Sequence, residues 1–351
     1  MLKQRIDFLR QLTETIGPSG MEDDVARLWQ ENTSKYCVDS TRDAHGNTIF
    51  VKGVDNNMRV MLAAHADEIG YMVKYIDDEG FIYFAQVGGL DRHLIPGRQV
   101  SIVTKKGVII GAIGKKATHL QDADEEKKLM KTKECWVDIG VKNKKEAEKI
   151  VSVGDYIVPN VKFENIRGDI YTSKAFDDRA GMFVINEVFR LLKGKKINCQ
   201  LYGVATVQEE IGLRGAKTSA YGIKPHVGIA IDVTHASDNP GSDKKYSGEI
   251  KLGAGPSICT GPNITPQLFD ALCAVAKKNK IPYQIEADEG VTGTDAAPIQ
   301  VSRMGVATGL ISIPLRYMHT PVEMVHLSDI ENAAKLLAAF VEGDIYGINK
   351  K

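Results

Sequence analysis

The apolar run at residues 58–64 constrains the fold of this chain more than any other stretch. Its sequence, Met-Arg-Val-Met-Leu-Ala-Ala, places apolar side chains on both faces of an extended strand. Strands of this kind lie in the middle of a largely parallel sheet that helices cover on both sides. The run passes directly into His65-Ala66-Asp67, so polar side chains begin where the predicted strand ends.

Strands and helices alternate along most of the chain. The predicted helices have apolar residues at helical spacing, whereas the predicted strands are short apolar runs. This alternation predicts an α/β fold with a mostly parallel sheet covered by helices. The predicted helices occupy residues 3–16, 21–32, 177–193, 265–278 and 328–341, and the other strands occupy 46–52, 199–208, 227–231, 283–287 and 307–313.

Residues 71–165 have a different character from the rest of the chain. Short alternating strands are separated there by tight turns, for example at 105–107. This pattern is typical of a small β-barrel or β-sandwich. The sequence therefore predicts a discontinuous α/β domain, formed by residues 1–70 and 166–351, with a β-rich domain inserted at 71–165.

Charge and cysteine content narrow the possible functions. The 45 Lys and Arg residues balance 45 Asp and Glu residues, so the net charge favours neither nucleic acid nor a membrane as a partner. We find no signal-peptide pattern and no apolar stretch long enough to cross a bilayer. The five cysteines are scattered, without a Cys-x-x-Cys pair. They indicate a reducing, cytoplasmic location and argue against a disulfide framework.

Polar residues cluster at the ends of predicted strands. Because sites in an open α/β sheet form outside the carboxyl ends of the strands, we expect these side chains to converge. Histidine and carboxylate ligands suit Zn²⁺, Co²⁺ or Mn²⁺, and one bridging carboxylate allows two ions to bind. The candidates are His65, Glu209, Glu210, Asp232 and His319 after strands, and Asp177 or Asp178 at the start of a helix.

The adjacent pair Glu209-Glu210 is the most informative of these candidates. Neighbouring side chains on a regular strand point to opposite faces, so the backbone must turn if both are to serve one site. A natural division gives one glutamate to a metal ion and leaves the other as a general base. Asp67, two residues after His65, can accept the second ring N–H of that histidine. Taken singly, each residue has an ordinary structural explanation as a turn, a helix start or a surface charge pair.

Five motifs together resemble the tetrahedral (TET) aminopeptidase and glutamyl aminopeptidase family of two-metal peptidases, some of which have been labelled endoglucanases. They occur in the order of the family and span most of the chain. The motifs are H-A-D-E-I-G at 65–70, K-A-F-D-D-R at 174–179, E-E-I-G-L-R-G-A at 209–216, D-V-T-H at 232–235 and M-H-T-P-V-E at 318–323.

The resemblance implies a role for each candidate residue. His65, Asp177 and Asp232 would hold one divalent ion, Zn or Co in first place and Mn as an alternative. Glu210 and His319 would hold the second ion, with Asp177 as the bridge between the two.

The resemblance also implies a mechanism and an assembly. Glu209 would act as general base and acid on a bridging water, and Asp67 would support His65. The substrates would be short peptides with a free N-terminus, cleaved by a catalytic metallopeptidase domain (1–70 and 166–351). The inserted segment 71–165 would serve oligomerisation and access, with dimers building a tetrahedral homododecamer.

Three other functions compete with this interpretation. A metal-dependent deacylase or carboxypeptidase could use the same scaffold and ligands. An endoglucanase would need two carboxyl groups flanking a glycosidic bond and normally no metal. A catalytically silent assembly protein would have no need of Glu209. The preferred N-terminal side chain stays open, although Arg303 or Arg316 could meet an acidic one.

Overall fold

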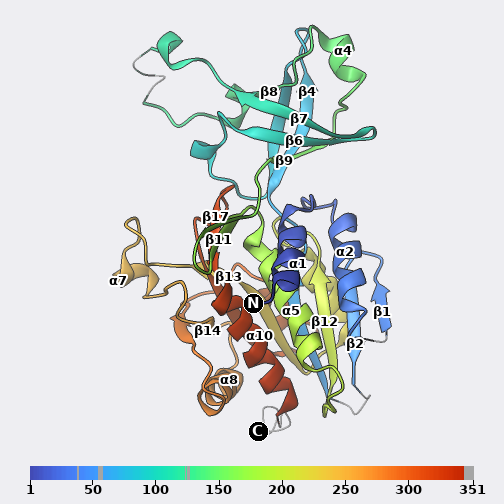
Figure 1. Ribbon diagram of the computed structural model, residues 1–351, viewed down its shortest axis with the longest axis vertical. Coiled ribbons are helices and arrows are strands. Elements are labelled where there is room, and N and C mark those ends of the chain that lie inside the picture. The colour runs from blue at the N-terminus through green and yellow to red at the C-terminus, as the bar shows by residue number, and fades with distance from the viewer. Residues whose placement is uncertain (38, 54–57, 123, 125–126, 344–351) are drawn as a thin grey trace.

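The computed structural model describes residues 1–37, 39–53, 58–122, 124 and 127–343. Figure 1 shows a large sheet with helices on both of its faces and a separate barrel beyond one end of the sheet. The α/β architecture with an inserted barrel is therefore confirmed. The last eight residues of the predicted segment 166–351 lie outside the described part of the chain.

The described α-helices are α1 (Lys3–Glu14), α2 (Asp23–Thr33), α4 (Lys144–Glu148), α5 (Phe176–Leu191), α6 (Arg214–Ile223), α7 (Lys244–Ser247), α8 (Pro266–Lys278), α9 (Ala296–Gln300) and α10 (Leu327–Glu342). The five predicted helices correspond to α1, α2, α5, α8 and α10, whereas α4, α6, α7 and α9 were not predicted. Short 3₁₀ turns occur at Arg92–Leu94, Thr118–Leu120 and Thr132–Glu134.

The large sheet is mixed rather than parallel throughout. Its central strands run in the order β12-β3-β13-β16 and are all parallel, whereas β2, β14 and β17 pair antiparallel with them. The outer strands β14 and β15 pair parallel with each other. Its strands are β1 (Asp39–Arg42), β2 (Thr48–Lys52), β3 (Arg59–His65), β10 (Glu164–Arg167), β11 (Ile170–Ser173), β12 (Gln200–Thr206), β13 (Val227–His235), β14 (Ser257–Thr260), β15 (Gln284–Ala287), β16 (Ala307–Arg316) and β17 (Glu323–His326).

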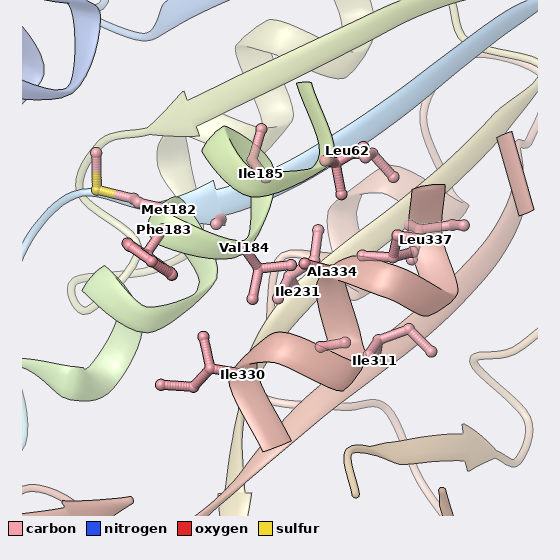
Figure 2. Close-up of a cluster of buried hydrophobic side chains, with 14 of the residues drawn as sticks. Leu62, Met182, Phe183, Val184, Ile185, Ile231, Ile311, Ile330, Ala334 and Leu337 are labelled. Atoms are coloured by element: carbon pink, nitrogen blue, oxygen red, sulfur yellow. The ribbon is translucent and has the colours of Figure 1, made fainter. Parts of the chain in front are cut away.

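Strand β3 is central, as its apolar sequence predicted. Leu62 faces the core under α5 and α10, whereas Met61 and Ala63 face the opposite side under α6 and α9. Figure 2 shows Leu62 in one buried apolar cluster with Val184 and Ile185 of α5 and with Ile330, Ala334 and Leu337 of α10. Apolar residues on both faces of one strand are therefore explained by helices on both faces of the sheet.

The barrel is formed by the segment between β3 and β10. Its six strands close in the order β4-β5-β8-β7-β6-β9 around an apolar core. They are β4 (Gly70–Ile76), β5 (Ile82–Val87), β6 (Gln99–Thr104), β7 (Gly107–Gly114), β8 (Trp136–Asp138) and β9 (Tyr156–Pro159). Because β4 begins five residues after β3 ends, the barrel lies directly beside the carboxyl ends of the central strands.

None of the helices in the described part of the chain is both long and apolar enough to cross a membrane.

Candidate metal centre

The predicted site residues come together at the carboxyl ends of the central strands. One cavity of about 560 Å³ is lined by all of the predicted metal ligands and by the predicted general base. They come from β3 (His65), the start of α5 (Asp177), the turn after β12 (Glu209 and Glu210), β13 (Asp232) and the loop after β16 (His319).

Asp177 lies between the two histidines. Its Oδ1 is 2.9 Å from Nε2 of His65, and its Oδ2 is 3.3 Å from Nε2 of His319. One imidazole comes from β3 and the other from the loop after β16, so this one carboxylate joins both halves of the cluster. The backbone around it supports the arrangement, because Asp177 has a non-helical conformation (φ −76°, ψ 107°) within the first turn of α5.

The backbone turns at Glu209 and Glu210, which lets both side chains enter the cavity. Gln208 and Gly212 have positive φ angles of 56° and 122° on either side of the pair. Oε2 of Glu210 is 3.6 Å from Nε2 of His319, and Oε2 of Glu209 is 4.0 Å from Nε2 of His65. The pair therefore divides between the two histidines, and the requirement for a turn is met.

The carboxylate of Asp67 holds this turn in place. Its Oδ1 accepts the backbone N–H of Glu209 at 2.9 Å, and its Oδ2 accepts that of Glu210 at 3.1 Å. The ring of His65 interacts with the same residue, since Nδ1 is 3.1 Å from the backbone oxygen of Asp67 and 3.6 Å from Oδ1. Asp67 thus fixes both the histidine and the glutamate pair.

Asp178 also lies within reach of the cluster. Ligand atoms of His65, Asp177 and Glu210 form one group within 4.8 Å, and atoms of His65, Asp178 and Asp232 form a second group within the same distance. Both oxygens of Asp178 accept backbone N–H groups, from His65 at 3.1 Å and from Gly181 at 3.0 Å. Each of these bonds uses one lone pair of an Asp178 oxygen and leaves another, whereas the oxygens of Asp177 face histidine rings.

Two supporting residues had no predicted role. Glu323, at the start of β17, accepts the backbone N–H of Asp177 at 3.1 Å and that of His319 at 3.2 Å. Ser19 donates to Oδ2 of Asp67 at 2.6 Å. Glu323 belongs to the motif at 318–323, so its sequence position was a signal, but Ser19 lies in a Gly-Pro-Ser-Gly turn that indicates only a break between helices.

A buried ion cluster ties the N-terminal segment to the site. Lys174 contacts Glu68 at 2.7 Å, and Glu68 also accepts the backbone N–H of Gly17 at 3.0 Å. The guanidinium of Arg179 donates to the carbonyl oxygens of Leu12, Thr15 and Gly17. These contacts anchor the turn that carries Ser19 next to the candidate metal centre.

Burial makes ionisation of most carboxyl groups in the cluster unfavourable. Burial raises the pKa of Glu209 to about 10 and that of Glu210 to about 8, and it also raises the pKa values of Asp178 and Asp232. Asp177 differs: burial acts against ionisation, but hydrogen bonds with His319 and His65 outweigh it and lower its pKa. Divalent cations would supply the positive charge that these buried carboxylates lack.

Fold and site together define an α/β protein with a candidate two-ion centre at the carboxyl ends of its central strands. A family model described as M42 glutamyl aminopeptidase matches residues 46–336. The chain belongs to this family, which confirms the resemblance predicted from the motifs. It is an aminopeptidase, a hydrolase of a metal-dependent peptidase family.

Similar proteins cover nearly the whole chain. The lysyl aminopeptidase of Pyrococcus furiosus is 36% identical over 343 residues, which are 96% of this chain and 96% of the relative. The structure of a TET aminopeptidase from the marine sediment archaeon Thaumarchaeota archaeon SCGC AB-539-E09 has a TM-score of 0.94 at 35% identity and covers 98% of each chain.

Two further structures differ in what their names describe. The TET1 peptidase of Pyrococcus horikoshii, which can assemble into a tetrahedron or a large octahedral shell, has a TM-score of 0.86 at 32% identity, over 96% of this chain and 99% of the other. A Thermotoga maritima protein named endoglucanase has a TM-score of 0.77 at 30% identity, over 95% and 96%.

Proposed function

We propose that this aminopeptidase uses two divalent ions to release the N-terminal residue of short peptides that carry a free amine. The position of Asp177 carries the proposal, because its two oxygens face one histidine at the end of β3 and another in the loop after β16. His65, Asp177 and Asp232 would hold one ion. Glu210 and His319 would hold the other, with Asp177 shared between them. Oxygen and imidazole donors suit Zn²⁺ or Co²⁺ best, with Mn²⁺ as an alternative.

Glu209 is the proposed proton carrier. When bound, the ions would polarise the peptide carbonyl and lower the pKa of a water between them. Glu209 takes no ion in this scheme, and the positive charge of bound ions would lower its raised pKa, so that its carboxylate could accept the proton of the attacking water. It then gives that proton to the departing amine. Asp67 keeps Glu209 aimed at the cavity through the backbone N–H bond of 2.9 Å.

The assembly and location are also proposals. The Pyrococcus horikoshii relative assembles into a tetrahedron, which favours a homododecamer built from dimers here too. We assign the catalytic part to 1–70 and 166–351, and oligomerisation and access to the inserted part at 71–165. A cytoplasmic location is supported by the free thiols of all five cysteines.

The competing functions fit less well. An endoglucanase would leave two histidines and at least one carboxylate of the cluster without a role. A silent assembly protein would have no use for the mostly buried Glu209. A deacylase or carboxypeptidase keeps the same ions and differs in the substrate end that it binds.

A peptide panel tests the proposal. Release of the N-terminal residue is measured with chelated protein and after addition of Zn²⁺, Co²⁺ or Mn²⁺, using free and N-acetylated versions of each peptide. We expect metal-restored cleavage of the free-amine peptides alone. Cleavage of the acetylated peptides would favour the deacylase, and activity that survives chelation would favour a metal-free hydrolase.

A further inference from the structure

Two carboxylates outside the candidate metal centre line the same cavity. Glu286 belongs to β15, and Asp288 follows that strand. Both side chains are half-buried. Among the described residues that line the cavity there is no lysine or arginine. Once divalent ions neutralise the metal cluster, the remaining charge of the cavity wall is therefore negative.

The carboxylate of Glu286 is held in a defined position. Ser257 donates to its Oε2 at 2.6 Å, and the hydroxyl of Thr234 donates to its Oε1. Thr234 lies two residues after Asp232 on β13, so one strand carries both a proposed metal ligand and an anchor of Glu286. Hydroxyl donors orient a carboxylate but leave its charge in place.

The arginines that could have met an acidic substrate are engaged elsewhere. Arg316 forms two hydrogen bonds with Asp238, at 2.8 and 2.7 Å. The guanidinium of Arg303 stacks over the ring of Tyr221 at 3.6 Å. Neither arginine lines the cavity. A substrate with an N-terminal glutamate would thus meet like charges without a compensating cation.

The pKa of the Cys259 thiol is affected by the same two carboxylates. This cysteine is buried in the cavity wall on β14. Burial first, and then the charges of Glu286 and Asp288, raise its pKa to about 12. Both carboxylates therefore act on one shared region of the wall.

We propose that Glu286, assisted by Asp288, selects peptides whose N-terminal side chain is cationic, namely lysine or arginine. This inference rests on the proposed aminopeptidase function and names the substrate class of that site. A lysine ammonium or arginine guanidinium would make charge-assisted hydrogen bonds to the oriented carboxylate. Acidic side chains are rejected by like-charge repulsion, which gives selectivity in both directions.

The first experiment compares matched peptides that differ in the N-terminal residue alone. The metal-loaded enzyme is assayed with lysine, arginine, norleucine, leucine and glutamate at that position. Norleucine is the key reference because it matches the lysine chain without its charge. We expect kcat/KM for lysine and arginine to exceed that for norleucine by about tenfold or more, with glutamate lowest. Added salt should reduce the lysine-to-norleucine ratio.

The second experiment assigns the preference to residues. Glu286→Gln should lower the lysine-to-norleucine ratio of kcat/KM by about tenfold, and Asp288→Asn should lower it by less. Glu289→Gln is the matched control, because this exposed neighbour lies outside the cavity and should leave the ratio unchanged. The ratio compares two substrates on one preparation, so partial unfolding of a variant does not alter it.

The two proposals fail in different ways. Metal-restored cleavage that is fastest for glutamate or equal for lysine and norleucine would overturn the charge selection and leave the aminopeptidase function standing. A lysine preference that survives in both Glu286→Gln and Asp288→Asn would overturn the assignment to these residues. Absence of cleavage for every free-amine peptide with every metal would overturn both proposals.

Discussion

The carboxyl end of the large sheet and the barrel differ in how many charged side chains they bury. Between Gly70 and Pro159, the described residues bury no charged side chain, and the buried polar groups there are Ser101 and Thr104. The carboxyl end of the large sheet and the elements next to it bury many charged side chains. They include His65, Asp67, Glu68, Lys174, Asp177, Asp178, Arg179, Glu209, Asp232, Asp295 and Glu323.

This difference separates what folds the chain from what acts on substrate. Burial of a charge is unfavourable unless the charge is paired, hydrogen-bonded or bound to a metal. The barrel avoids this cost because apolar side chains form its core. The carboxyl end of the sheet buries charged groups in spite of this cost. There Glu323 and Asp67 accept backbone N–H groups of Asp177 and Glu209, and these bonds hold the site carboxylates in one cavity.

The largest expected effect is at Asp177. Asp177→Ala removes a ligand from both proposed ions, so kcat/KM should fall by more than about 10⁴-fold, beyond the range of a single proton carrier. Metal content per folded chain should fall with it, measured by elemental analysis. Asp24→Ala, which changes an exposed aspartate of α2, is the control. Two ions retained per chain in Asp177→Ala would contradict the shared-ligand role.

Glu209→Gln should have the next largest effect. The change removes the proton acceptor and keeps the size of the side chain, so turnover should fall by about 10²–10⁴-fold while metal content is retained. Glu210→Gln provides the contrast, because it should lose metal as well. A near-normal turnover in Glu209→Gln would remove Glu209 from the mechanism.

A core substitution in the barrel should reverse this pattern. Ile102 is fully buried, so Ile102→Ala should lower the free energy of unfolding by about 2–5 kcal/mol. Metal content and turnover per folded chain should stay the same. Urea unfolding at one fixed protomer concentration measures the change, with Val153→Ala at an exposed barrel position as the control. Loss of metal from folded Ile102→Ala would show that the two regions are coupled.

The smallest effect tests the opposite end of the sheet. His226 precedes β13, and its Nδ1 accepts the backbone N–H of Arg59 at 3.1 Å. Burial and the charge of Arg59 lower its pKa below 6.5. The unfolded chain therefore binds more protons near this pH, so this histidine costs stability as the pH falls through 6.5. Because the ring is only half-buried, solvent screening keeps the effect below about 1 kcal/mol.

His226→Asn keeps an acceptor for Arg59 but cannot take up the proton. The unfolding free energy of the wild type minus that of the variant should therefore decrease when the pH is lowered from neutral to about 5. Titration of the ring by NMR gives the pKa directly. A difference that stays constant over this range would show that the ring environment does not favour the neutral form.

The central strands and the convergence of the candidate site residues were predictable because their signals are local. Residues 58–64 are apolar on both faces, and His65 and Asp67 follow at once along the chain. The short marginal strands were harder, since β11 joins the sheet by pairing antiparallel with β17, which is far away in sequence, and β10 is attached only through β11. Their apolar content is too low to indicate a strand without the neighbouring strand.

The sequence analysis did not predict the roles of Glu323, Ser19 and Glu286 at the site. Their roles depend on contacts with Asp177, Asp67 and Thr234, which are between 48 and 146 positions away along the chain. Nothing in the spacing of single residues encodes such pairs. The candidate arginines show the same limit, because Arg303 and Arg316 are equally plausible in sequence and both lie outside the cavity.

The sequence by itself determined the main amphipathic helices, the central strands and the residue types that end these strands, because side-chain period and strand-end polarity are properties of neighbouring residues. The tertiary structure alone decided which carboxylate faces both histidines, which glutamate lies nearer each histidine and which charge lines the far part of the cavity. These depend on hydrogen bonds and burial that exist after distant segments pack together, and burial is what makes each charge matter.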